Sequence, residues 1–114
     1  MSVSYSKTRT FKRVLFTLTT DGSGDATGTS EVISGEINRV VVVPGAGVSN
    51  GVKVKLSDET TYDLLDSDGN DGVAIDDASL PKEFPLSKGV DSALTCTISA
   101  GGDTKSILVY VYYR

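Results

Sequence analysis

Acidic side chains gather in one short stretch of this sequence, and they are its most obvious candidates for chemistry. The residues with oxygen ligands there are Asp63, Asp66, Asp68, Asn70 and Asp71. Oxygen atoms at alternating positions are typical of a calcium loop, and Asp66, Asp68 and Asn70 fit its first three positions. The sixth position requires Gly but holds Asp71, and the twelfth requires Glu but holds Asp77. We therefore expect an acidic Asp-Gly turn in solvent, with a metal site at Asp66, Asp68 and Asn70 as the weaker alternative.

Other catalytic constellations have little support in the sequence. There is no His, which removes the usual general base and the commonest metal ligand of an enzyme. The glycines of DGSGDATG are not followed by Gly-Lys-Ser/Thr, so no phosphate-binding loop is expected. Cys96 alternates with threonines in ALTCTIS, and this pattern predicts a small core residue on a strand. We expect no enzyme and no cofactor, and a hydrolase that uses carboxylates alone is the remaining enzymatic alternative.

Basic residues are concentrated at the N-terminus. Four of the eleven lie within the first 13 residues, namely Lys7, Arg9, Lys12 and Arg13. Residues 14–114 hold the other seven basic residues and all fifteen acidic ones, a formal charge of −8. We interpret residues 1–13 as an extended basic arm on a single domain spanning 14–114. The arm either attaches to an acidic partner surface or is an ordinary solvated terminus. The acidic body argues against nucleic acid as a partner.

The N-terminal sequence gives no sign of export. MSVSYSKTRTFKRV lacks an apolar core and a cleavage site, so we expect no signal peptide. No apolar run approaches the length needed to cross a bilayer, so no membrane partner is expected. These features predict a protein that is made in the cytoplasm and stays soluble there unless it is assembled into something larger.

The elements that must position these residues are short and rich in β-formers. VKVKLSD alternates strictly and predicts a strand with one face in water. SALTCTIS and KSILVYVYYR flank AGGDT and predict a terminal hairpin. Two prolines in DDASLPKEFPLSKG predict a long connection rather than a strand. DGSGDATGTS predicts a loop that is either flexible or shaped on contact, and Gly35 predicts a bulge or tight bend.

Together these segments predict the fold class. Turns of Gly, Asp, Asn and Ser recur every 8–12 residues, and no helical period is present. The sequence therefore predicts an all-β protein, an antiparallel β-sandwich of about seven or eight short strands with jelly-roll or Ig-like topology.

Two segments are apolar on both faces, whereas a strand with one face in water alternates apolar and polar residues. INRVVVVPG contains four consecutive valines, and ILVYVYYR alternates two apolar sets of side chains. One face of each strand can enter a core, whereas the other needs a cover. Tyrosine suits an interface because its ring buries a large area while its hydroxyl stays hydrated or bonded. We predict that Val41, Val43, Tyr110 and Tyr112 contribute to a partner interface; a covering loop of the same chain is the alternative.

The succession SGEINRVVVVPG, NGVKVKLSDETTYDLLDSDGNDG, FPL and SALTCTISAGGDTKSILVYVY resembles a family of small all-β structural proteins of tailed bacteriophages. The shared pattern is a G-x-I-x-x-V-x-V-x-P-G strand, a Y-D segment ending in D-x-D-G-x-D, then L-T-hydrophobic-T-I-S and a closing V-x-hydrophobic-Y strand. The resemblance covers roughly residues 30–113, and its motifs are structural. The charged strand before YDLL departs from the family order and leaves the strand pairing there open. Genes of this kind tend to lie among virion structural genes.

The resemblance implies a virion protein, made in the cytoplasm of the host bacterium. The most concrete expectation is a capsid decoration (cement) protein that binds the major capsid protein across subunit joints and stabilises the head. A homo-oligomer is expected, with a trimer favoured. In that setting Lys7, Arg9, Lys12 and Arg13 would lie on an acidic shell. The alternatives are a tail, collar or fibre-attachment accessory protein and, from another class, a carbohydrate-binding β-sandwich that uses calcium.

Overall fold

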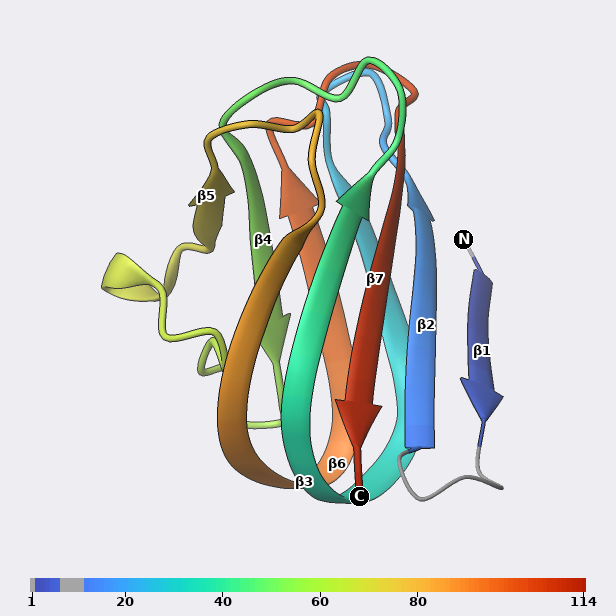
Figure 1. Ribbon diagram of the computed structural model, residues 1–114, viewed down its shortest axis with the longest axis vertical. Helices are drawn as coiled ribbons and strands as arrows, with labels where there is room; N and C mark the ends of the chain where they lie inside the picture. The colour runs from blue at the N-terminus through green and yellow to red at the C-terminus, as the bar shows by residue number, and fades with distance from the viewer. Residues whose placement is uncertain (1, 7–11) are drawn as a thin grey trace.

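The computed structural model describes residues 2–6 and 12–114, so Lys7 and Arg9 lie outside the described residues. The strands are β1 (Ser2–Ser6), β2 (Lys12–Thr19), β3 (Ala26–Pro44), β4 (Val52–Ser57), β5 (Val73–Ile75), β6 (Lys82–Ser99) and β7 (Ser106–Tyr113), as Figure 1 shows. A single turn of 3-10 helix, η1 (Asp68–Asn70), precedes β5. Within the described ranges no helix is long and apolar enough to span a membrane.

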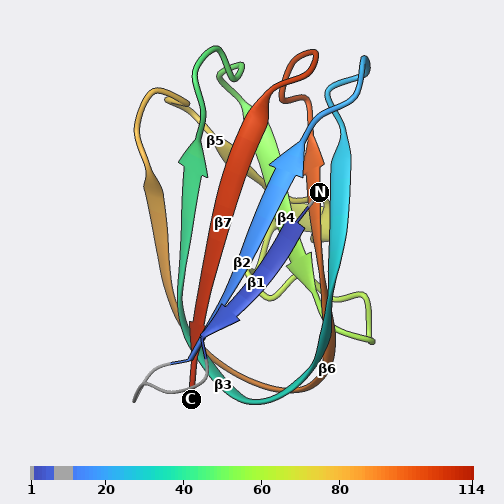
Figure 2. The same cartoon turned by 90° about the vertical axis from the view of Figure 1, so that its right-hand side faces the viewer.

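The strands form one sheet in the order β1-β2-β7-β3-β6-β4-β5, and every neighbouring pair is antiparallel. The prediction of an all-β, antiparallel protein is therefore confirmed. The expectation that all strands are short is wrong, since β3 has 19 residues and β6 has 18. These two strands pair along most of their length and curve together at one end of the molecule, which folds the sheet back on itself (Figures 1 and 2).

The curvature divides the sheet into two layers. The first layer contains β1, β2, β7, the second half of β3 and the first half of β6. The second layer contains the first half of β3, the second half of β6, β4 and β5. Figure 2 shows β7, β2 and β1 in front, with β4 behind them. In both layers inward and outward side chains alternate along each strand, because successive side chains of a strand point to opposite faces.

The core lies between the two layers. The first layer contributes Val14, Phe16, Leu18, Val40, Val42, Ile107, Val109 and Val111, and the second contributes Ile33, Val52, Val54, Leu56, Ile75, Leu94, Cys96 and Ile98. Cys96 is a fully buried free thiol on β6, so its predicted place on the inward face of a strand is confirmed. Burial raises the pKa of the Cys96 thiol to about 12, with a smaller contribution from the charge of Asp63.

Gly35 lies where β3 passes from one layer to the other, in agreement with the predicted bend. Its φ of +148° is favourable for glycine, and an added Cβ would collide with the backbone carbonyl of Arg114. The neighbouring Glu36 and Arg114 exchange backbone hydrogen bonds of 2.7 and 3.0 Å. Register shifts between Thr29 and Val32 and between Ile37 and Arg39 flank this point, and bulges of this kind increase the bending of a strand.

Three local predictions are wrong. The terminal hairpin does not form, because β6 pairs with β3 and β4, whereas β7 pairs with β2 and β3. The intervening turn instead crosses between the layers. The segment from Lys82 onward is the first half of β6 and not a connection. Pro85 is tolerated because, in the described chain, this half of β6 pairs only with β3 and leaves one edge free for a residue without an N–H.

The third correction concerns residues 21–30, which were expected to form one loop. Strand β3 already begins at Ala26, so only the turn before it is irregular. The Asp21 side chain accepts hydrogen bonds from the backbone N–H of Ser23 at 2.8 Å and of Asp25 at 3.1 Å. These bonds lower the pKa of Asp21, the bond from Asp25 most. The Gly101 N–H donates to the Gly24 carbonyl at 2.9 Å, which holds this turn against the turn that follows β6.

Candidate protein-binding face

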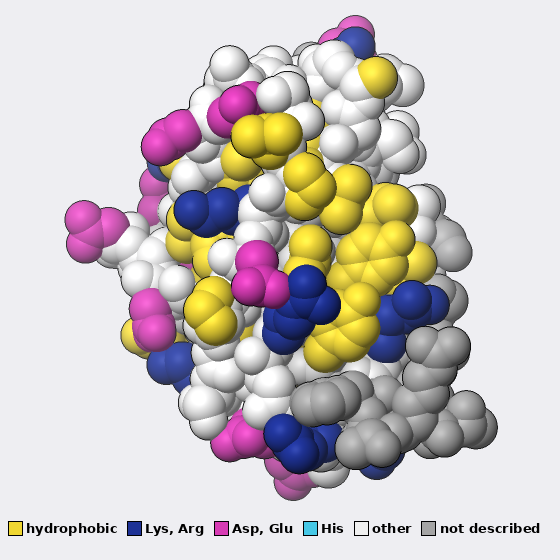
Figure 3. Space-filling model, in the orientation of Figure 1, with side chains coloured by type: hydrophobic (Ala, Val, Ile, Leu, Met, Phe, Trp, Pro, Cys, Tyr) yellow, Lys and Arg dark blue, Asp and Glu magenta, His cyan; other side chains and the backbone are white. Residues whose placement is uncertain are grey.

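The outward side of the first layer carries a row of apolar side chains that no other described element covers. β2, β7 and β3 contribute Leu15, Leu108, Tyr110, Tyr112, Val41 and Val43, and we call this set the tyrosine face. All six side chains are partly exposed, whereas the residues that alternate with them, such as Val42, Val109 and Val111, are buried in the core. Apolar side chains gather over β7 and β3 in Figure 3, with basic side chains on either side.

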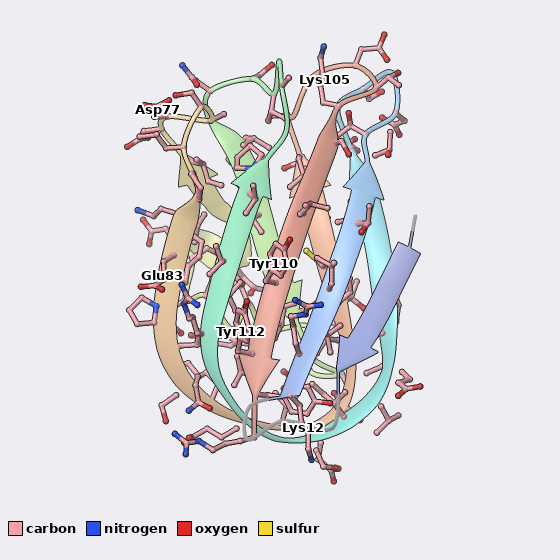
Figure 4. All side chains as sticks on the ribbon, turned by 45° about the vertical axis from the view of Figure 1, so that its right-hand side comes forward. Lys12, Asp77, Glu83, Lys105, Tyr110 and Tyr112 are labelled. Atoms are coloured by element: carbon pink, nitrogen blue, oxygen red, sulfur yellow. The ribbon has the colours of Figure 1, made fainter. Side chains whose placement is uncertain are left out.

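The strand register places these side chains in level rows. Leu15, Tyr110 and Val41 lie side by side, because Leu15 pairs with Tyr110 and Tyr110 pairs with Val41. In the next row Leu108 pairs with Val43. Side chains at such opposed positions lie about 5 Å apart at Cβ, close enough to form one continuous surface. Figure 4 shows Tyr110 and Tyr112 projecting from β7 on the same side of the sheet.

Two arginines flank the tyrosines and stack on them. The guanidinium carbon of Arg13 lies 5.5 Å from the centre of the Tyr110 ring, and that of Arg39 lies 5.3 Å from the Tyr112 ring. A guanidinium group at this distance is attracted by the ring face, and a stacked arginine keeps its N–H edges available for further hydrogen bonds. The Nε of Arg13 is buried and has no hydrogen-bond partner among the described residues.

An ion pair borders the face on β6. The Nε of Arg39 donates a short hydrogen bond to a carboxylate oxygen of Glu83. The two side chains keep 51% and 52% of their surface exposed, so each can contact a second molecule as well. Aromatic and arginine side chains around an apolar centre are typical of protein–protein interfaces, and such residues often dominate the binding energy.

Val41, Val43, Tyr110 and Tyr112 were predicted together, and the structure brings all four together on the tyrosine face. The basic residues are separated: Arg13 borders this face, whereas the Lys12 ammonium lies 5.9 Å from the ring of Tyr113, which faces the core. Both residues belong to β2, and residues 2–6 pair with that strand as β1. The predicted arm boundary at residue 13 therefore falls inside a strand.

Leu15, Arg39 and Glu83 were not predicted as part of the face. Leu15 and Arg39 carry a signal, because each stands an even number of residues from another outward side chain on its own strand. Arg39 is two residues before Val41, and such residues share a face of a strand. Glu83 carried no usable signal, since its segment was interpreted as a connection.

Side chains of the acidic stretch bond mostly within their own loop, although the buried Oδ2 of Asp63 has no hydrogen-bond partner among the described residues. The Asp66 carboxylate accepts a hydrogen bond from the Tyr62 hydroxyl at 2.6 Å and pairs with the Lys88 ammonium at 3.1 Å. The Tyr62 bond and then Lys88 hold the pKa of Asp66 below its ordinary value. Asn70 accepts from the Asp63 N–H at 2.5 Å and donates to the Thr61 carbonyl at 2.9 Å. Its side chain thus holds the turn together.

The predicted metal residues therefore have separate roles. Asp66 pairs with Tyr62 and Lys88, Asn70 braces the turn, and Asp68 is exposed in η1. No group of three or more His, Cys, Asp or Glu side chains able to hold a metal ion is found in the described part of the chain. A groove of about 640 Å³ lies beside this loop, between it and the first residues of β6, and Leu64, Phe84 and Leu86 are among its lining residues.

The outward side of the second layer has a different composition. It carries Thr27, Thr29, Thr95, Thr97, Lys53 and Lys55, which we call the threonine face. Thr29 and Thr95 lie opposite each other with their hydroxyl oxygens 3.4 Å apart. The Lys53 ammonium donates to the Asp71 carboxylate at 2.6 Å, and this bond lowers the pKa of Asp71. Each of these six side chains has a polar group for water to solvate, and Val32, 68% exposed and paired with Ala93 on the same side, is an isolated apolar exception.

No protein-family model matches the chain, and no curated protein matches it.

Proposed function

We propose that this protein is a non-enzymatic assembly protein that buries its tyrosine face against another protein subunit. The observation that carries the proposal is the tyrosine face itself, which presents six apolar side chains side by side. Large contiguous apolar patches are rare on proteins that remain alone in water. Tyrosine and arginine in the same patch favour a protein partner over a small molecule, since these residue types are enriched at interfaces.

We further propose that the assembly is the virion of a tailed bacteriophage and that the chain decorates the capsid. The support for this step is the sequence resemblance over residues 30–113, with which the all-β fold is compatible. Binding across joints between capsid subunits would stabilise the shell by mass action, because the decorating protein would bind only the assembled state. A tail or collar position would use the same face. We propose that the two layers serve as a β-sandwich, and its jelly-roll or Ig-like topology stays a prediction, as does the oligomer number.

The test is to ask where the chain is found in assembled particles. Particles are purified from cells that carry the gene with its neighbouring structural genes, and the copies per head are counted by mass spectrometry. The wild type is expected on heads in a fixed copy number. The variant Tyr110→Ser/Tyr112→Ser is expected at least about 10-fold depleted, because interface tyrosines are common hot spots.

The matched control is Thr95→Ser/Thr97→Ser on the threonine face, which is expected at wild-type copy number. Location on tails instead of heads would replace the decoration role with the tail or collar role. Absence of the wild type from all particles would overturn the virion proposal.

A further inference from the structure

The tyrosine face has an uneven distribution of charge from one side to the other. Its strands follow the order β2-β7-β3-β6. Arg13 lies on β2 at one border, and Glu83 lies on β6 at the other, where Arg39 reaches it from β3. The apolar side chains lie between these borders. One border therefore carries a cation whose Nε lacks a partner in the described chain, and the opposite border carries a half-exposed carboxylate.

This arrangement is complementary to itself. Consider two copies packed face to face about a two-fold axis that runs along the strands between β7 and β3. The rotation sets β2 of each copy opposite β6 of the other, and β7 opposite β3. Tyr110 then packs on Val41 of the other copy, which is level with it. Arg13 lies one row from the level of Glu83 of the other copy, a distance that an arginine side chain spans.

The other two-fold axis in the plane of the face runs across the strands and gives a different result. It sets every strand opposite its own copy, so that β6 faces β6 and Glu83 comes near Glu83. Like charges facing each other across an interface are unfavourable and oppose that arrangement. Both axes leave the two sheets aligned to within about 30°, the common way in which two sheets pack, so the charges at the borders decide between them.

We propose that the partner of the tyrosine face is a second copy of this chain, joined about the strand-parallel two-fold axis with two symmetric Arg13–Glu83 contacts. The inference rests on the proposed use of this face for protein binding and names its partner. A C2 interface of this kind uses the same patch on both subunits. In the resulting dimer both threonine faces point outward, away from each other, and stay in contact with water.

The size of the face sets the expected strength. Four strands by eight residues measure roughly 19 by 26 Å, from the usual strand spacing and rise. Such a face buries roughly 1,000 Å² in total over the two copies, at the low end for specific interfaces. We therefore expect a dimer that dissociates at micromolar concentrations, whose formation is sensitive to single charges at the border.

The experiment is sedimentation velocity on the purified full chain from about 5 to 500 µM, a range suited to an interface of this size. The wild type is expected to pass from monomer to dimer. Arg13→Glu and Glu83→Arg are each expected to weaken the dimer at least about 10-fold, since each places like charges together twice. The double variant Arg13→Glu/Glu83→Arg is expected to regain most of this loss. Glu59→Arg, on the loop after β4, makes the same change of charge away from the face and is expected to have no effect.

Melting curves establish that each variant is folded. If Glu83→Arg does not fold, a double-mutant cycle with Arg13→Gln and Glu83→Gln measures the same contact, and additive effects would overturn the pairing. A wild type that stays monomeric at every concentration would overturn the second copy as partner. The proposed function is tested independently by the particle experiment. It would still stand if the variant Tyr110→Ser/Tyr112→Ser were depleted from particles, and it would be overturned if the wild-type chain were absent from all particles.

Discussion

The two outward faces of this protein share strands β3 and β6 and cover the same core, yet they differ in chemistry. On the first layer the outward positions hold Tyr110, Tyr112 and Val41, and on the second they hold Thr95, Thr97 and Lys55. The inward positions of both layers are mostly valine, leucine and isoleucine. Alternation along a strand is the same in both layers, so the pattern alone makes no distinction between them.

The difference shows what each face requires from its surroundings. Threonine suits a strand because it is β-branched, and its hydroxyl keeps the face compatible with water. Tyrosine and valine also suit a strand but leave apolar area exposed, and burying such area contributes about 25 cal/mol per Å². The threonine face is therefore complete in solvent, whereas the tyrosine face gains from a protein cover.

The largest effect is expected on association. Tyr110→Ser/Tyr112→Ser should raise the dissociation constant of the dimer by about 100-fold or more, because two central aromatic anchors are removed from each copy. The matched pair Thr95→Ser/Thr97→Ser should change it by less than about two-fold. Sedimentation velocity measures both constants. An equal change in the dissociation constant for the two double variants would show that the tyrosine face is not the dimer interface.

The second effect is on stability and separates inward from outward positions. Val42→Ala and Val54→Ala lie in opposite layers, both fully buried, and each should lower the free energy of unfolding by about 2 kcal/mol. Val43→Ala should cost less than about 1 kcal/mol, since its side chain is partly exposed. Urea unfolding below the dissociation constant measures the monomer alone. A cost for Val43→Ala equal to that for Val42→Ala would mean that the monomer covers its own tyrosine face.

A third effect belongs to the second layer, beneath the threonine face. The pKa of Cys96 is raised to about 12 in the folded protein from an ordinary value of 9.0. Above pH 9 the unfolded thiol loses its proton while the folded one keeps it, so stability falls as pH rises towards 12. The expected slope from this group is about 1.4 kcal/mol per pH unit. Urea unfolding at several alkaline pH values should show this slope in the wild type and a smaller one in Cys96→Ala. Identical slopes would show that the thiol does not contribute.

The smallest effect concerns the charge on the threonine face. The hydrogen bond from Lys53 lowers the pKa of Asp71, so the folded state releases this proton more readily than the unfolded state does. Its contribution to stability is present above the ordinary pKa of Asp and is lost as the pH falls through the folded pKa. Lys53→Met should move the Asp71 pKa upward in an NMR titration, with Lys105→Met as the control at a distant turn. A pKa of Asp71 that stays unchanged would mean that the pair is not formed in solution.

Prediction from the sequence succeeded where the period of two decides the outcome. Val41, Val43, Tyr110 and Tyr112 share a face because outward residues on neighbouring antiparallel strands project from the same side of the sheet. Cys96 was placed in the core by the same rule. The rule fails for β6, where Pro85 suggested a break. A proline is harmless on a free strand edge, but the free edge exists only once the partners of the strand are known.

The sequence by itself determined the all-β class, the alternation along each strand and the two strands that are apolar on both sides. It also contained the uneven charge distribution, with four of the eleven basic residues within the first 13 positions. These properties depend on neighbours in the chain, where local sterics and the strand period operate.

Only the tertiary structure decided which strands pair and which residues border the tyrosine face. The sequence around the turn after β6 is compatible with a hairpin, yet β3 takes the place beside β7. Pairing between strands that are far apart in the sequence, such as β3 and β7, depends on how the whole chain buries its apolar faces. A long intervening segment does not prevent such pairing, because the entropy cost of closing a loop rises only slowly with its length. The contact of Arg39 with Glu83 spans 44 residues for the same reason, and it brings the carboxylate to the border of the face.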